Sequence, residues 1–226
     1  MAATPQRAER IAYGAADQRR VVLLLTLAYT LNAADRTLIA IIGQPLKVDL
    51  NLSDAKLGLL IGSAFAMLYA FSGLAIARLA ERVNRVGLIV VCLTAWSLLT
   101  ALCGVAASFP QLLLIRMGVG VAEAGCTPPA HSLIADYVGP ARRSTALSVY
   151  SCGISLGYIF SALIGGYLAL HYGWRTACVV IGLPGILVAV LIRRGVREPP
   201  RGNCEAPSWT PSPVTARPWR GAEEGA

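Results

Sequence analysis

Four ionisable side chains interrupt apolar segments of the sequence. Asp35 and Arg36 are adjacent in "LNAADRTLIA", and Arg116 and Glu123 lie in "LLLIRMGVGVAEAG". A charged side chain at the centre of a membrane helix costs about 2.5–3.5 kcal/mol on insertion scales, so such residues are kept for a partner or a function. A carboxylate shielded from bulk water holds a proton more readily than one in water, so both acids are candidates for carrying a proton.

Helical spacing predicts which of these side chains meet. Adjacent residues on a helix point about 100° apart, so Asp35 and Arg36 do not satisfy each other. Arg116 and Glu123 are seven positions apart, hence on one helix face and roughly 10 Å apart along its axis. Depths estimated from the helix ends place Asp35 level with Arg116, which predicts an ion pair. We expect Arg36 and Glu123 to face the same polar cavity, connected by water or substrate.

This four-residue cluster has two interpretations. It could be a static set of ion pairs that orients two helices, or it could line a water-filled cavity and exchange protons. A buried ion pair stabilises weakly where hydrophobic packing would serve as well, and this favours the second interpretation. His131, near one end of the same segment, is expected to be a polar packing residue, and no role is expected for His171.

The elements that position these residues must be membrane helices. The chain has 226 residues, of which 55% are hydrophobic and 14% charged, with a mean hydropathy of +0.59. A soluble domain is usually about one quarter charged, so the composition predicts an integral membrane protein. Paired metal ligands and a Ser/His/Asp spacing are absent from the sequence, and the six cysteines form no CxxC pair, so we expect neither an enzyme, a metal nor a cofactor.

Apolar runs long enough to span a bilayer predict an all-α, multi-pass fold of six transmembrane helices. They cover about 21–43, 57–79, 87–108, 111–136, 145–169 and 174–194. Residues 1–20 form a polar cytoplasmic lead, residues 21–194 the six-helix bundle, and residues 195–226 a Pro-rich tail that we expect to be disordered. The first run loosely resembles a signal peptide, but it resumes beyond Ala34 and further runs follow, which disfavours cleavage.

Arginine positions predict the orientation of the bundle. The gaps rich in arginine alternate with gaps that hold few basic residues, as the positive-inside rule requires. Both termini are therefore expected in the cytoplasm, with the chain in the cell (inner) membrane. The net charge of +8 follows from this pattern and does not indicate nucleic acid as a partner.

An internal repeat is visible in the sequence. "YAFSGLAIARLA" at 69–80 matches "YIFSALIGGYLA" at 158–169 at six positions that include Tyr, Phe and Ser. Chance similarity of apolar helices is the alternative, but the shared Tyr-x-Phe-Ser favours a 3+3 inverted repeat. Gly153 and Gly157 are spaced for close helix packing, and Pro128-Pro129 should kink or loosen the helix that contains them.

Several motifs resemble those in the N-terminal six-helix half of major facilitator superfamily transporters. "LAERVNR" is similar to the loop signature between its second and third helices, and "NAADR" resembles the Asn-x-x-Asp-Arg of its spinster-like branch. "SDAKLGLL", "WSLLTALCG", "LLLIRMGVGVAEAG", "PPAHSLIAD" and "GWR" extend the similarity over about residues 21–200. The anion:cation symporter branch shares several of these strings and is the alternative.

The resemblance implies a secondary active transporter that alternates between inward-open and outward-open states. It implies proton coupling through Asp35 and Glu123, with Arg36 and Arg116 as candidates for holding anionic groups of the substrate. The implied substrate is a small amphiphilic or anionic organic solute, or a lysolipid-like molecule, since spinster-like proteins are associated with lysophospholipids and sphingosine phosphate.

The resemblance also implies a cytoplasmic gate network that holds the two halves of a transporter together. Its expected members are Glu81, Arg82, Arg85 and Asp136. Two departures from the signature, Ala77 in place of Gly and Glu81 in place of Asp, would weaken this network.

The family has twelve helices, whereas this sequence predicts six. "REPPRG" resembles the start of the central loop, after which a second bundle would follow. We therefore expect the bundle to form a homodimer, to pair with a second half-transporter, or to be a truncated half without transport activity.

Overall fold

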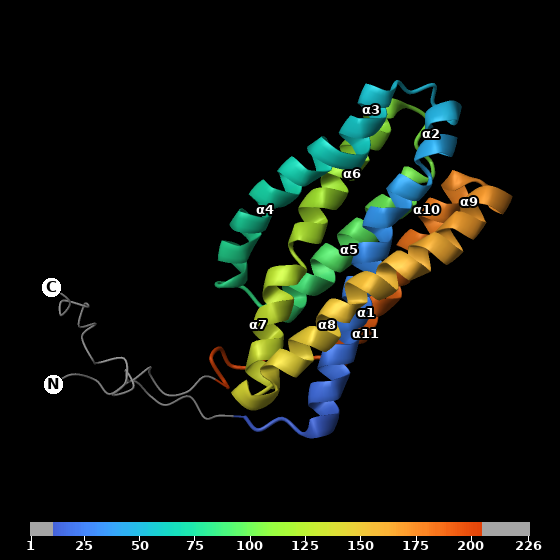
Figure 1. Ribbon diagram of the computed structural model, residues 1–226. Coiled ribbons are helices and arrows are strands. Elements are labelled where there is room, and N and C mark those ends of the chain that lie inside the picture. The colour runs from blue at the N-terminus through green and yellow to red at the C-terminus, as the bar shows by residue number, and fades with distance from the viewer. Residues whose placement is uncertain (1–10, 205–226) are drawn as a thin grey trace, which may run out of the picture.

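The computed structural model describes residues 11–204, which form helices and no β-strand (Figure 1). In chain order these are α1 (Ala15–Ile41), α2 (Gly43–Asp49), α3 (Asp54–Gly58), η1 (Leu59–Ser63), α4 (Ala64–Ala80), α5 (Arg85–Cys103), α6 (Phe109–Ala124), α7 (Thr127–Tyr137), α8 (Pro140–Phe160), η2 (Ser161–Gly165), α9 (Gly166–Tyr172), α10 (Trp174–Gly182) and α11 (Pro184–Gly195). The elements η1 and η2 are single π-helical turns that continue their neighbouring helices.

Within residues 11–204, five stretches are long and apolar enough to cross a membrane. They are Ala15–Ile41, Asp54–Ala80, Arg85–Cys103, Pro140–Tyr172 and Trp174–Gly195. The other predicted span, 111–136, is divided between α6, with 16 residues, and α7, with 11. Pro128 and Pro129 cannot donate backbone hydrogen bonds to the preceding turn, so the helix breaks around Gly125. The predicted loosening is therefore a break in this structure.

Helix packing agrees with an inverted repeat. α1 packs on α8, α6 packs on α4, and α5 packs on both α6 and the pair α10–α11. In such a repeat the first span corresponds to the fourth and the second span to the fifth. The contact of α1 with α8 therefore corresponds to the contact of α6 with α4. A methyl group on Gly157 would lie 2.4 Å from the Thr30 carbonyl oxygen, so glycine is needed where α8 crosses α1.

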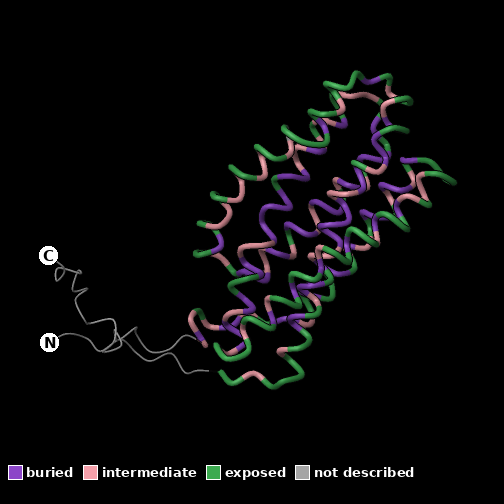
Figure 2. Tube along the Cα trace, in the orientation of Figure 1, coloured by how far each residue is buried: buried purple, intermediate pink, exposed green. Residues whose placement is uncertain are grey.

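Buried residues lie mainly on α1, α5, α6, α7 and α10, while α4 and α8 carry long rows of exposed residues (Figure 2). Trp96, Leu93 and Ile181 are fully buried around α5. The exposed side chains of α4 are nevertheless apolar, with Met67 61% and Phe71 72% exposed. These surfaces face lipid or another protein rather than water.

The two ends of the described chain meet at one end of the bundle, which we call the terminal end (Figure 1). The Asn203 amide accepts a hydrogen bond from the backbone N–H of Ile11 at 2.8 Å and donates one to the carbonyl of Ile11 at 2.9 Å. α1 begins at Ala15, within the predicted polar lead, and residues 1–10 lie outside the described residues.

Residues 196–204 differ from the disordered tail that the sequence predicts. The Tyr137 hydroxyl donates to the Arg197 carbonyl at 2.6 Å, and Arg201 donates to the carbonyls of Ala80 and Val83. These long-range bonds order a segment that has no helical pattern of its own. The rest of the predicted tail, 205–226, lies outside the described residues.

The opposite end of the bundle, the far end, carries α2 and α9. Here Arg175 Nη1 donates to Asp49 Oδ2 at 2.5 Å, and Trp174 Nε1 donates to the same oxygen at 3.3 Å. The hydrogen bond from Arg175 lowers the pKa of Asp49 below its ordinary value. This contact fixes α2 against the start of α10.

Candidate functional site

Two ion pairs join α1 to α6 inside the bundle. Arg116 Nη1 donates to Asp35 Oδ2 at 2.9 Å, and Arg36 Nε donates to Glu123 Oε2 at 2.7 Å. The first pair is the one that helical spacing predicts. In the second pair the two side chains touch directly, whereas the sequence predicted only that they share a cavity.

The four charges differ in exposure. The side chains of Asp35 and Glu123 are 0% exposed and that of Arg116 is 3% exposed, whereas Arg36 is 34% exposed. Arg36 is thus the member of the cluster that a solute could reach. An acid and a base in each pair leave the site without net charge, as burial in a medium of low dielectric requires.

Several buried polar atoms of this site have no hydrogen-bond partner among the described residues. They are Asn32 Nδ2, Asp35 Oδ1, Arg36 Nη2, Arg116 Nε and Glu123 Oε1. Buried polar groups normally find a partner, so this concentration marks a place for water or for a bound solute.

Two aromatic rings of α4 complete the site, and sequence reasoning missed both. The guanidinium carbon of Arg36 lies 4.2 Å from the ring centre of Tyr69 and 5.5 Å from that of Phe65, and Arg116 lies 5.2 Å from Phe65. Cation–π contacts of this kind hold a guanidinium in place without neutralising its charge. The one available signal was Tyr69, which opens the internal repeat.

The local sequence explains how α4 and α6 position these groups. A methyl group on Gly120 would lie 3.2 Å from the Phe65 ring, so the absence of a side chain lets the ring approach α6. Glu123 stands in the last turn of α6, where its backbone carbonyl accepts a hydrogen bond from Cys126 at 3.1 Å. The break before Pro128 therefore directly follows the acid.

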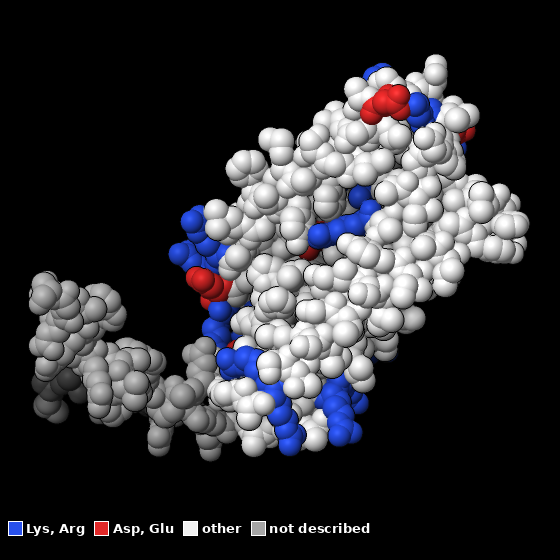
Figure 3. Space-filling model, in the orientation of Figure 1, with Lys and Arg blue, Asp and Glu red and all other residues white. Residues whose placement is uncertain are grey.

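Seen from outside, the site lies in the middle of one face of the molecule. Figure 3 shows a small group of basic and acidic atoms there, surrounded by uncharged surface, while most other charges gather at the two ends. This face lies between α4 and α8 (Figure 1). A charged patch surrounded by uncharged surface is the arrangement expected of a polar site within a membrane.

Two of the four residues predicted for a cytoplasmic gate network, Arg85 and Asp136, contact each other in the structure. Arg85 Nη1 donates to Asp136 Oδ2 at 2.5 Å, and Arg85 Nε donates to Glu198 Oε1 at 2.6 Å. Glu198 also accepts from the Val86 N–H at 2.9 Å, and sequence reasoning missed this acid. Glu81 and Arg82 are exposed, and neither side chain makes an ion pair with another residue in 11–204.

The two histidines lie apart from the ion pairs. His131 is exposed and meets the Tyr150 ring edge-on at 5.2 Å, and Tyr150 stacks on Tyr29 at 4.5 Å. His171 lies at the far end, where its Nδ1 is 3.0 Å from the carbonyl oxygen of Tyr167. Across residues 11–204 no three His, Cys, Asp or Glu side chains are grouped as metal ligands.

Comparisons with known proteins agree with this architecture. The family model described as Major Facilitator Superfamily matches residues 25–222. An MFS-type efflux pump of Mycolicibacterium smegmatis is 42% identical over 77% of this chain and 41% of its own length. A hexuronate transporter of Bacillus subtilis is 29% identical over 85% of this chain and 46% of its own length.

A solved structure shows the same arrangement of helices. It is a bacterial homologue of the human lysosomal transporter Spinster, in an inward-facing and unoccupied conformation. It is 42% identical, superposes with a TM-score of 0.83, and is matched over 88% of this chain and 47% of its own. The chain thus spans less than half the length of the relatives it matches.

Proposed function

The chain belongs to the major facilitator superfamily, and we propose on this basis that it forms one half of a proton-coupled secondary active transporter. The proposed cargo is a small amphiphilic or anionic organic solute, or a lysolipid-like molecule. The observation that carries this proposal is the pair of ion pairs, Asp35 with Arg116 and Arg36 with Glu123, buried beneath one otherwise uncharged face.

Substrate recognition is assigned to Arg36. Its Nη2 is buried without a partner among the described residues, and its side chain is the most exposed of the four charges. A guanidinium binds a carboxylate or phosphate through parallel hydrogen bonds. The neighbouring rings of Tyr69 and Phe65 offer apolar surface, so an anion with an apolar portion fits better than a bare inorganic ion. The similarity to a hexuronate transporter supports an anionic cargo.

Proton coupling follows from charge balance. The cluster contains two acids and two bases, so a bound anion would leave one uncompensated negative charge in a buried site. Protonation of Glu123 removes that excess and frees Arg36 to bind the anion. Because binding equilibria are reciprocal, the anion favours the proton and the proton favours the anion. Asp35 is the second candidate, since its Oδ1 also lacks a partner among the described residues.

The terminal end is proposed to face the cytoplasm of the cell (inner) membrane. Arg19, Arg142 and Arg193 are exposed at this end, in agreement with the positive-inside rule. Arg85 and Asp136 would then belong to a cytoplasmic gate network. Glu81 and Arg82, without ion-pair partners among the described residues, are free in that proposal to meet another bundle.

A second bundle is proposed to close the site. The helices α4 and α8, which border the face that holds the ion pairs, carry exposed apolar side chains, for example Phe71 on α4 and Leu156 and Ile159 on α8. The opposing wall would come from a second copy of this chain or from another half-transporter. A half without that wall, and hence without transport activity, is the alternative.

Reconstitution of the chain in liposomes tests this proposal. We expect a proton gradient, acidic outside, to drive uptake of a hexuronate or a lysophosphatidate, and Glu123→Gln and Asp35→Asn to remove the gradient dependence. His171→Gln, at the far end, is the matched control and should transport like the unmodified chain. Gradient-driven uptake that is unchanged in both acid variants would refute the proton role. If the chain is a monomer in detergent and transports neither solute in liposomes, the alternative of a half without transport activity is supported.

A further inference from the structure

A cavity lies at the terminal end, between the first turns of α1 and α8. It has a volume of about 580 Å³, which falls within the range of about 300–1,000 Å³ typical of small-molecule sites. We call it the α1–α8 groove. It is separate from the ion-pair site, because Arg19 precedes Asp35 by roughly 24 Å along the axis of α1.

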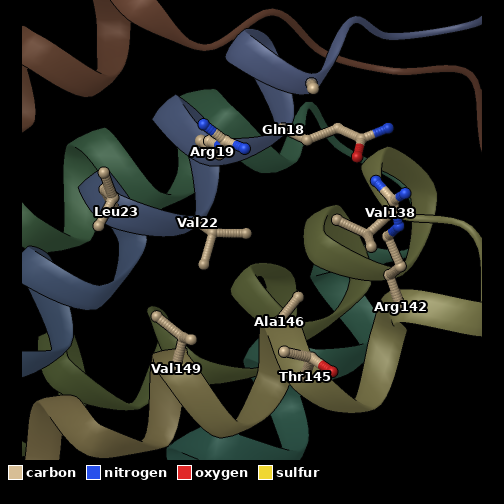
Figure 4. A pocket seen from close by; sticks show the side chains of 10 residues that line it. Gln18, Arg19, Val22, Leu23, Val138, Arg142, Thr145, Ala146 and Val149 are labelled. Carbon is tan, nitrogen blue, oxygen red and sulfur yellow. The ribbon is translucent and has the colours of Figure 1, made fainter.

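The walls of the α1–α8 groove are apolar. Val22 and Leu23 of α1 face Ala146 and Val149 of α8 across the gap (Figure 4). Val22 is 7% exposed and Ala146 9%, so they form the base, while Leu23 is 62% exposed and lies at the open side. A surface of this kind at the side of a membrane bundle suits a hydrocarbon chain.

The groove has a basic entrance. Arg19 and Arg142 line it, and Figure 4 shows Arg142 extending from α8 toward the α1 wall. Both are exposed, and within residues 11–204 neither makes an ion pair. The first turn of α8 has no side-chain cap from Gly139, so its backbone N–H groups add partial positive charge at the same end. Two arginines above an apolar groove complement a phosphate that carries an acyl chain.

We propose that the α1–α8 groove binds an anionic phospholipid of the membrane leaflet on the terminal side. The phosphate lies between Arg19 and Arg142, and an acyl chain lies against Val22 and Val149. Basic pockets between transmembrane helices bind acidic head groups in this way. Because the lipid touches both α1 and α8, it links the helix that carries Asp35 and Arg36 to the helix at the edge of the open face.

Lipid titration followed by native mass spectrometry tests this site on the full chain in detergent. We expect one phosphatidylglycerol to bind at least about tenfold more tightly than phosphatidylcholine, since two nearby arginines favour an acidic lipid by roughly 10- to 30-fold. The double variant Arg19→Gln/Arg142→Gln should lose this preference. Equal binding of the two lipids by the unmodified chain would overturn the proposal.

A matched control distinguishes lipid binding in the groove from attraction of the lipid by the net positive charge of the protein. The double variant Arg78→Gln/Arg193→Gln removes the same charge from exposed positions outside the groove and should keep the preference within about twofold. An equal loss in both double variants would show that net charge alone attracts the lipid, and would overturn the site.

A third variant tests the acyl chain. Thr145 lines the groove and is exposed, so Thr145→Phe fills it without disturbing the core or the arginines. We expect phosphatidylglycerol binding to weaken by tenfold or more. Unchanged binding, or displacement of the lipid by millimolar glycerol 3-phosphate, would mean that the site binds only the anionic head group. Either result would contradict the proposal that an acyl chain occupies the groove.

Discussion

The guanidinium carbon of Arg36 lies 4.2 Å from the centre of the Tyr69 ring, while its Nε donates to Glu123. One arginine is thus held by a carboxylate of α6 and an aromatic ring of α4. The ring fixes the guanidinium without using its charge, so Arg36 remains able to accept a second anion.

The Tyr69 ring should therefore contribute to anion affinity. We expect Tyr69→Leu to weaken binding of a hexuronate or lysophosphatidate by roughly 2- to 30-fold, the range of a cation–π contact, and Tyr69→Phe to weaken it little. Isothermal titration calorimetry provides the measurement. Phe71→Leu, an exposed aromatic substitution on the same helix, is the control and should bind normally. Equal anion affinities for Tyr69→Leu and the control would show that the Tyr69 ring does not contribute to anion binding.

The Asp35–Arg116 pair should stabilise the fold only as a pair. Asp35→Asn leaves the buried Arg116 guanidinium without a counter-charge, which costs about 3–5 kcal/mol of unfolding free energy. The double variant Asp35→Asn/Arg116→Gln should recover much of that loss. Thermal unfolding in detergent measures the stability of the single and the double variant. Asp49→Asn, which removes one partner of an exposed ion pair, is the control and should change the stability little. Additive losses in the double variant would show that the two side chains are not coupled.

The Asp35–Arg116 ion pair was predictable from the sequence, because charges in apolar segments need partners and helices have a fixed rise, whereas Arg36 and Glu123 were expected only to share a cavity. Depth alone matched Asp35 with Arg116. Phe65 and Tyr69 were not predictable, since an aromatic residue on a membrane helix is ordinarily a packing residue. Glu198 was missed because it bonds to Arg85 across 113 residues of sequence, in a segment without periodicity.

Anion binding at Arg36 should take up a proton. If protonation of Glu123 balances the charge of the bound anion, affinity should rise by up to about tenfold for each unit that the pH falls, over the range in which Glu123 is ionised in the free protein. The sign follows from uptake, since a complex that holds more protons is favoured at lower pH. Calorimetry in buffers of different ionisation enthalpy counts the protons. Glu123→Gln should bind with no such dependence, and an affinity that rises with pH would contradict the coupling.

The far-end contact should open in acid. The hydrogen bond from Arg175 lowers the pKa of Asp49, so the ionised contact persists through the ordinary carboxylate range and is lost as the pH falls through the lowered value. Trp174 donates to the same carboxylate, so its fluorescence should change in that acid range. Asp49→Asn should abolish the transition. An identical transition in this variant would assign it to another group.

Glu198 should hold residues 196–204 against the bundle. It accepts hydrogen bonds from Arg85 and from the Val86 N–H, and bonds involving a charged group contribute about 1.5–3 kcal/mol each. In Glu198→Gln the carboxylate charge is gone and Arg85 keeps only Asp136 as an acidic partner. The segment should therefore detach more often.

Tryptic cleavage reports this detachment, because Arg201 lies within the segment and donates to backbone carbonyls of Ala80 and Val83 while it is docked. When opening is fast relative to cleavage, the rate follows the open population, so we expect Glu198→Gln to be cut after Arg201 about tenfold faster or more. Glu81→Gln removes an exposed carboxylate from the same end and should be cut at the unmodified rate. Equal rates in both variants would mean that other bonds, such as those of Asn203, hold the segment.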